Sequence, residues 1–287
     1  MQNNLLFALT ALAMFLFSAS CSKSESLTDP TPSAHPLDKE GWKFVWGDEF
    51  DGTQIDYTNK WNAEIAGNGF GNNEAQYYTA RPRNLRLENG KLIIQAHRET
   101  FTGPDGFRRD YTSGKLMSKR PGFLYGRFEI RAKIPRGRGT WPAIWMLPDE
   151  ATFSPQYWPD NGEIDIMEHV GFDVGRIHAS IHTKLYNHRI GTQVTRSITV
   201  PTAVDSFHVY ALEWSENKID MFVDDTKYFT FERGNLNWEG YPFTHRFYLI
   251  LNLAIGGDWG GAQGIDDAIF PVQMEVDYVR VYRKATP

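Results

Sequence analysis

The sequence predicts an all-β protein in which two antiparallel sheets pack face to face as a sandwich. Short apolar or alternating runs recur along the chain, and turn residues such as Asn89-Gly90 separate them. No segment combines a sustained helical periodicity with capping residues. Many strands with almost no helix are typical of such a sandwich. The 287 residues, 41% of them hydrophobic, suffice for one large core.

Five runs justify the main strands in their order along the chain. They are residues 91–96 after the Asn-Gly turn, the alternating runs 125–134 and 219–223, the continuous apolar run 247–255 and the alternating run 274–282. Alternation places every second side chain in the core, whereas a continuous apolar strand is expected where both faces are covered. Asn252 interrupts that apolar strand and, if buried, needs a hydrogen-bonding partner.

The N-terminus has the features of an export signal. Residues 5–17 form an apolar run that is too short to span a bilayer and suits a signal peptide. Small residues then precede Cys21, the single cysteine of the chain, and this order resembles a bacterial lipoprotein whose thiol is acylated after cleavage. We expect an exported protein that is lipid-anchored at the cell envelope or outer membrane. An ordinary signal peptide, giving a secreted or periplasmic protein, is the alternative.

Composition divides the chain into three parts and limits its partners. We expect a signal peptide at 1–21, a tether rich in Ser, Thr and Pro at 22–40, and one folded domain at 41–287. The formal net charge of −5 argues against a nucleic-acid surface and favours a neutral polymer over a polyanion. We expect a monomer that contacts a membrane only through the lipid anchor.

The most informative run is Glu163-Ile164-Asp165-Ile166-Met167-Glu168, in which three acids interrupt an apolar segment. Burying carboxylates there is costly unless they are paired or used. In a regular strand Glu163 and Asp165 share a face and Glu168 does not. One extra residue, a β-bulge, would return Glu168 to that face. Two carboxyls on one face are what retaining glycoside hydrolysis requires. An acidic edge strand facing solvent is the alternative.

Aromatic and polar residues elsewhere could form the surroundings of these acids. Trp141 and Trp145 lie four residues apart on one face of a predicted strand, where they would either stack on sugar rings or fill the core. His182 alternates with Ser180 and His178 in what we expect to be the next strand of the acid-bearing sheet.

Two glycine-rich loops are further candidates for ligand contacts. The loop Gly256–Gly261 presents Trp259, and the loop Gly67–Glu74, which contains Asn73, has the same character. With Arg98, discussed below, the candidates for substrate binding are Trp141, Trp145, His182, Trp259, Asn252, Asn73 and Arg98.

The run Glu163–Glu168 resembles the signature of glycoside hydrolase family 16, and segments 141–148, 162–171, 256–261 and 276–282 resemble its laminarinase-type members. The resemblance extends over about 42–283. It implies a concanavalin A-like β-jelly roll with a concave substrate cleft and a retaining, endo-acting mechanism. It also implies that Glu163 is the nucleophile, Asp165 its assistant and Glu168 the acid/base. The inserted Met167 matches the bulged form of the laminarinase-like members.

The resemblance further implies a β-glucan substrate with β-1,3 linkages, either laminarin or a mixed-linkage β-1,3/1,4-glucan. Hydrolysis of another polysaccharide such as a galactan, transglycosylation, and a non-catalytic carbohydrate-binding module are the alternatives. Catalysis needs no cofactor. Relatives often carry a structural Ca²⁺, whose ligands by position would be Glu49, Gly90 and Asp277. Where relatives often have an early Arg, this chain reads Gln95-Ala96-His97-Arg98, so we expect different inner subsites with Arg98 as a candidate.

Overall fold

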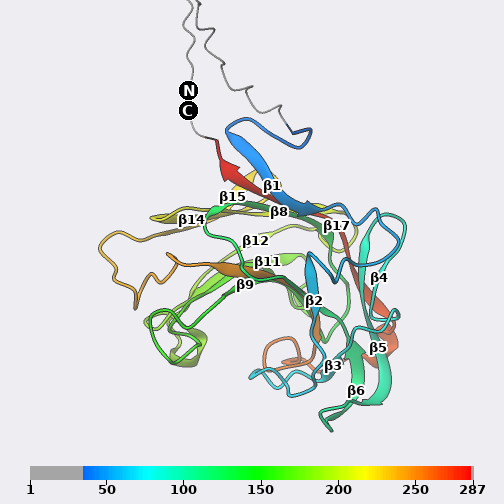
Figure 1. Cartoon of the computed structure of the whole chain (residues 1–287). Coiled ribbons are helices and arrows are strands. Elements are labelled where there is room, and N and C mark those ends of the chain that lie inside the picture. Colours follow the sequence, from blue (N-terminus) through cyan, green and yellow to red (C-terminus); the bar gives the residue numbers. More distant parts are fainter. Residues whose placement is uncertain (1–34, 286–287) are drawn as a thin grey trace, which may run out of the picture. The chain divides into compact units, whose positions relative to one another are not determined.

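The computed structural model describes residues 35–285 and consists of two β-sheets packed face to face (Figure 1). The predicted β-sandwich is confirmed. Within the described residues the helical elements are two 3₁₀ turns, η1 (His188–Ile190) and η2 (Asp267–Ile269). None of these residues forms a helix long and apolar enough to cross a membrane. The signal peptide and Cys21 lie outside the described residues.

One sheet has seven strands, all joined as antiparallel neighbours. In spatial order they are β12 (Val194–Thr199), β11 (Arg176–His182), β10 (Glu163–Glu168), β9 (Thr140–Pro148), β16 (Phe247–Ile255), β7 (Lys115–Ser118) and β2 (Trp61–Ala63). The acid-bearing strand β10 therefore lies between the strand of the two tryptophans and the strand of the alternating histidines, and the second of these neighbours was predicted from the sequence.

The other sheet has ten strands. Its path is β15 (Thr226–Glu232), β14 (Lys218–Val223), β13 (His208–Trp214), β8 (Gly126–Lys133), β17 (Val272–Lys284), β5 (Leu92–Thr102), β6 (Arg108–Ser113) and β3 (Gln76–Tyr78), while β1 (Trp42–Asp48) pairs with β17 and β4 (Leu85–Leu87) with β5. One pair departs from the predicted antiparallel arrangement, because β3 runs parallel to β6.

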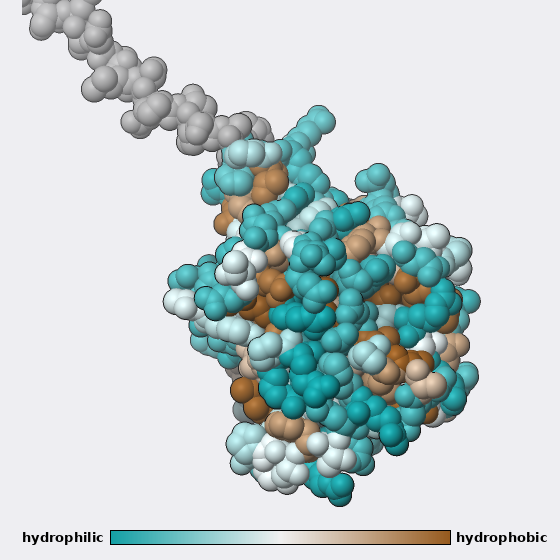
Figure 2. Space-filling view, turned by 90° about the vertical axis from the view of Figure 1, so that its right-hand side faces the viewer, coloured by the Kyte–Doolittle hydropathy of each residue, from teal (hydrophilic) through white to brown (hydrophobic). Residues whose placement is uncertain are grey.

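The ten-stranded sheet carries charged side chains on its outer face. Arg127 donates to Glu129 at 2.6 Å and to Glu213 at 2.7 Å, which explains the alternation of charged and apolar residues along β8. Lys39 extends this ladder by bonding Glu129 at 2.6 Å. The side of the domain that carries β5 and β6 is likewise mostly hydrophilic, with small separate apolar patches (Figure 2).

The folded domain begins earlier than the predicted boundary at residue 41. Besides the Lys39 pair, the ring of His35 stacks on Phe44 with centroids 4.5 Å apart. Asp38 accepts a hydrogen bond from the Phe44 backbone at 2.8 Å. Residues 35–40, which composition assigned to the tether, therefore pack against β1. Composition gave no sign of this because the contacts are made by polar groups.

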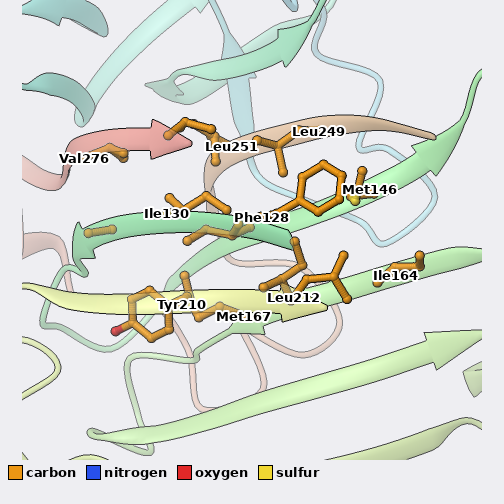
Figure 3. Packing of buried hydrophobic residues seen from close by; sticks show 14 of the residues in the cluster. Phe128, Ile130, Met146, Ile164, Met167, Tyr210, Leu212, Leu249, Leu251 and Val276 are labelled. Carbon is orange, nitrogen blue, oxygen red and sulfur yellow. The ribbon is translucent and has the colours of Figure 1, made fainter. Parts of the chain in front are cut away.

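The core fills the space between the sheets (Figure 3). Phe128 and Ile130 of β8 meet Met146 of β9 and Leu249 and Leu251 of β16, and all five are fully buried. All nine residues of β16 are buried, as the continuous apolar run predicted. Such burial of large apolar side chains contributes about 1.5–3 kcal/mol each and is the main source of stability in a domain without disulfides.

Strand β10 contains the predicted bulge. Ile166 and Met167 together oppose one residue on each neighbouring strand, and both are fully buried. From the opposite sheet Tyr228 donates its hydroxyl to the Ile166 carbonyl at 3.4 Å. A second tyrosine of that sheet, Tyr210, is buried with a hydroxyl that has no hydrogen-bond partner among residues 35–285. Of these two tyrosines, Tyr228 links the bulge to the opposite sheet by a hydrogen bond and Tyr210 does not.

We expect Tyr228→Phe to lower the free energy of unfolding by about 0.5–1.5 kcal/mol, the usual contribution of one hydrogen bond. Tyr210→Phe is the matched control and should leave stability unchanged or raise it, because its hydroxyl is desolvated without a bond. Urea unfolding of both variants measures the difference. Equal losses in the two variants would contradict the role given to Tyr228.

Candidate active site

The bulge brings three acids onto the outer face of β10. Glu163, Asp165 and Glu168 lie opposite His182, Ser180 and His178 of β11. These three partners are spaced two residues apart on a regular strand and so share one face. The acids must share it too, while the intervening Ile164, Ile166 and Met167 belong to the core.

Burial disfavours charge on all three acids. The side chain of Glu163 is 15% exposed and that of Asp165 only 3%. Desolvation, followed by the charge of Asp165, raises the pKa of Glu163 well above its usual range. Desolvation and the charge of Glu168 do the same to the pKa of Asp165, and desolvation raises the pKa of Glu168. The cluster therefore holds protons that isolated surface carboxyls would lose.

Two indoles bond the two glutamates separately. Trp158 donates from Nε1 to Glu163 Oε2 at 2.8 Å, and Trp141 donates from Nε1 to Glu168 Oε1 at 3.0 Å. Each bond favours the ionised form of its carboxyl and so opposes part of the rise in pKa. Trp141 was predicted near the acids. Trp158 was missed, although it stands only five residues before Glu163.

The position of Trp158 depends on a folded loop. The buried side chain of Asn161 accepts from the Phe153 backbone at 2.7 Å and donates to the carbonyls of Ser154, Gln156 and Tyr157. These bonds fix the segment between β9 and β10. A Trp in a loop directly before an acid triplet was the one signal in the sequence that could have indicated this contact.

His182 lies beside the acids, as predicted. Its Nε2 is 3.2 Å from Asp165 Oδ2 and 3.8 Å from Glu163 Oε1. The ring is nearly buried and packs against Trp158 and His188, whose centroids lie 6.0 and 5.2 Å away. The imidazole can therefore interact with either carboxyl without a large movement.

Trp145 and Asn252 belong to a buried polar network next to the acids. The Trp145 indole donates to Asn252 Oδ1 at 2.7 Å, and Asn252 donates to the Tyr78 hydroxyl at 3.1 Å, which supplies the partner that the sequence required. Tyr78 donates in turn to Glu74 at 3.1 Å. The ammonium of Lys115 lies 5.3 Å from the Trp145 ring centroid. Tyr78 and Lys115 were missed, and Glu74 was included only as the last residue of a candidate loop, because these residues are far from the acids in sequence and meet them only in the fold.

The two glycine-rich loops are joined to each other. Asn73 donates to Asp258 Oδ1 at 2.8 Å, and the Asp258 backbone donates to the Asn72 carbonyl at 2.8 Å. Trp259 stands edge-on to Trp141 and to His178, with centroids 5.6 and 5.0 Å apart. The Trp259 loop is therefore braced on the strand that carries Trp141.

Arg98 does not belong to this group. It lies on β5 of the ten-stranded sheet, and its guanidinium pairs with Asp267 at 2.8 Å. The prediction placed it at the substrate because of its position after an early strand. In the structure Arg98 instead pairs with Asp267, the first residue of η2, and its side chain is largely exposed.

Both acids of the predicted calcium set are paired with arginines. Arg280 bonds both carboxylate oxygens of Glu49, at 2.8 and 2.7 Å, and Arg131 bonds Asp277 Oδ2 at 2.6 Å. Gly90 lies in the turn between β4 and β5. Among residues 35–285, the acid and histidine side chains close enough to share a cation are Glu163, Asp165 and His182.

Comparison with known proteins identifies the family. The model of glycosyl hydrolases family 16 matches residues 70–280. A β-glucanase of Rhodothermus marinus is 53% identical over 249 residues, which cover 84% of this chain and 85% of that protein.

Solved structures agree. The laminarinase of Rhodothermus marinus superposes with a TM-score of 0.82 at 52% identity, covering 85% of this chain and 98% of that one. SCLam, a non-specific endo-β-1,3(4)-glucanase, does so with a TM-score of 0.80 at 44% identity, covering 86% and 93%. With an acid cluster on a bulged strand and a match across most of its length, this chain belongs to glycosyl hydrolase family 16.

Proposed function

We propose that the protein is a retaining endo-β-glucanase that hydrolyses glucans containing β-1,3 linkages. The observation that carries the proposal is the outward face of β10, where Glu163 and Glu168 flank Asp165 and each glutamate is bonded by its own indole. A sugar lying across this face would meet a carboxyl at either side of the bond to be broken. Similarity to a β-glucanase and a laminarinase supports the choice of substrate.

Two steps complete the reaction. In the first, the Glu163 carboxylate attacks the anomeric carbon, while protonated Glu168 gives its proton to the departing glycosidic oxygen. In the second, water attacks the resulting glycosyl ester and gives its proton to Glu168, which frees Glu163 and restores both groups. The chemistry needs Glu168 to hold a proton when Glu163 does not. Burial raises the pKa of both glutamates, which suits Glu168 as the acid and opposes ionisation of Glu163. The charge of His182 and the hydrogen bond from Trp158 act against the rise in the pKa of Glu163 and so favour its ionised form.

Asp165 acts through its neighbour. It is almost fully buried beside Glu163 and its pKa is raised by desolvation, so its carboxyl is held in the protonated form over a wider pH range. A protonated Asp165 can donate a hydrogen bond to the Glu163 carboxylate, hold its rotamer and offset the cost of charging it. His182, near both carboxyls, limits the same cost by its dipole or charge.

The surroundings suit a neutral, bent polymer. Trp141 and Trp259 rise beside the acids as apolar surfaces of the kind that stack on pyranose rings. The nearby Lys115 lies among aromatic rings, and its ammonium is 3.9 Å from Glu64. A second cation, Arg189, lies over the Trp158 ring, so the preference for a glucan rests on similarity to the glucanases rather than on the charge of the site.

Export and lipid anchoring at Cys21 remain proposals that rest on the N-terminal sequence alone. The monomeric state is also a proposal, and the one side of the domain seen in Figure 2, with its small apolar patches, is consistent with it.

Calcium, in our proposal, binds only weakly near Glu49, Gly90 and Asp277. Calcium affinity rises with the number of carboxylates that are free to ligate it. Here Arg280 and Arg131 already neutralise the two acids. An ion would have to share or displace these arginines, and it would depend on backbone carbonyl oxygens for the rest of its ligands.

Substitution of each glutamate tests its role. Glu163→Ala and Glu168→Ala should each remove glucan hydrolysis, with a loss of roughly 10²–10⁴-fold or more, while leaving the fold intact. On an activated β-glucoside with azide, Glu168→Ala should yield the azide of retained configuration and Glu163→Ala the inverted one. Product configuration by NMR decides between them, and the opposite pattern would exchange the two roles.

A second prediction concerns the indoles. The acid limb of the kcat/KM profile reports the nucleophile, which must be ionised, and the alkaline limb reports the acid, which must be protonated. Each indole lowers the pKa of its carboxyl, so its loss raises that pKa. Trp158→Phe should therefore move the acid limb to higher pH, and Trp141→Phe should move the alkaline limb to higher pH. Each variant is the control of the other, and crossed shifts would contradict the assignment.

Product analysis on pure polysaccharides tests the substrate. We expect laminarin and mixed-linkage glucan to be cut to short oligosaccharides and straight β-1,4 cellulose to resist. Digestion of agarose without action on either glucan would disprove the proposed substrate but not the assignment of the catalytic residues. Products longer than a defined starting oligosaccharide would instead indicate a transglycosylase.

Thermal unfolding tests the calcium proposal. EDTA should leave the midpoint unchanged, and added calcium should raise it only at millimolar concentration. A clear rise at micromolar calcium would show that the ion displaces Arg280 or Arg131 and would overturn weak binding.

A further inference from the structure

The reaction centre contains a set of atoms with the geometry of a metal site. His182, Asp165 and Glu163 each offer one donor atom, and the three donor atoms lie within 4.8 Å of one another. His182 Nε2 is 3.2 Å from Asp165 Oδ2 and 3.8 Å from Glu163 Oε1. Ligands of a tetrahedral ion with bonds of about 2.0–2.2 Å are separated by roughly 3.4 Å, so small side-chain rotations would complete three corners.

Two of the three residues are buried, and the donor atom of one lacks a hydrogen-bond partner in the described part of the chain. Asp165 is only 2% exposed and His182 only 6% exposed. Within residues 35–285, Asp165 Oδ2 accepts no hydrogen bond of good geometry, although it faces the imidazole. Glu163 uses its other oxygen, Oε2, for the Trp158 indole, which leaves Oε1 toward the same point. A buried acceptor that lacks a donor is costly, and a bound cation would remove the cost.

The donor types restrict the choice of ion. Two carboxylate oxygens and one imidazole nitrogen suit Zn²⁺ and similar divalent transition ions. Mg²⁺ and Ca²⁺ prefer six or more oxygen ligands, which this group does not offer. Three carboxyls on one face of β10 would also gain from a double positive charge among them.

We propose that the reaction centre binds one divalent transition ion of the Zn²⁺ class through His182, Asp165 and Glu163, and that this ion excludes productive binding of the glucan. The ion engages the lone pair with which Glu163 would attack the sugar, and it occupies the face on which the sugar must lie. Inhibition is therefore competitive. The inhibitory part of the inference rests on the proposed function, whereas the binding part does not.

Isothermal titration of ZnCl₂ into the purified protein tests binding without any use of catalysis. We expect one ion per chain, with affinity at least tenfold weaker in His182→Gln and in Asp165→Asn. His178→Gln is the matched control, because His178 lies on the same strand and face but outside the donor set. It should keep the wild-type affinity within about twofold. MgCl₂ should give no comparable signal.

Thermal unfolding of each variant shows whether it is folded. If one of the two ligand variants does not fold, the other still tests the site. Equal Zn²⁺ affinity in wild type and both ligand variants would overturn the site. Kinetics with laminarin then test exclusion: Zn²⁺ should raise KM and leave kcat unchanged, equally in wild type and His178→Gln. A fall in kcat at constant KM would show a site elsewhere. A protein that binds Zn²⁺ as described but hydrolyses no glucan would overturn the proposed function and keep the metal site.

Discussion

The desolvation of three neighbouring carboxyls is the constraint on which the rest of the structure depends. An acid cluster on a strand between two others costs free energy unless its neighbours compensate. The bulge in β10 separates the apolar side chains from the acids, since it directs Ile166 and Met167 into the core and Glu168 outward. The indoles of Trp141 and Trp158 then offset part of the cost of burying the two glutamates by donating a hydrogen bond to each. Asp165 receives no such donor, and this asymmetry separates the three acids chemically although they share one face.

Rigidity around the acids comes from polar groups as much as from the apolar core. Trp145, Asn252 and Tyr78 form a chain of hydrogen bonds that ends on Glu74. This chain fixes strands β9, β16 and β3 and the loop before β3 to one another. The bond between Asn73 and the Trp259 loop adds a second brace. Partners held this way lose little freedom when a sugar binds, which favours both affinity and a reproducible geometry of attack.

The strands and the common face of the acids could be predicted because both follow from local alternation. Glu163 and Asp165 share a face by alternation, and a single extra residue after Asp165 places Glu168 on that same face. Asn252 needs a hydrogen-bonding partner in an apolar strand whichever sheet contains that strand. Trp158 could not be placed, since its loop takes its path from the side-chain bonds of Asn161 rather than from any period. Arg98 was misplaced for a related reason. Alternation identifies a strand but does not give the partner of a charged side chain, which here is Asp267 of η2.

Strand β17 follows every other described strand in the sequence, yet it occupies the middle of the larger sheet, with β8 on one side and β5 on the other, and it also receives β1. Until β17 has been synthesised, the edges of β8 and β5 that pair with it in the folded protein have no partner strand. The sandwich therefore cannot close from its beginning toward its end, and folding depends on contacts between distant parts of the chain, which makes it slow. The export proposed above would benefit from such a delay, because a chain whose largest sheet has not yet formed is still unfolded when it is translocated.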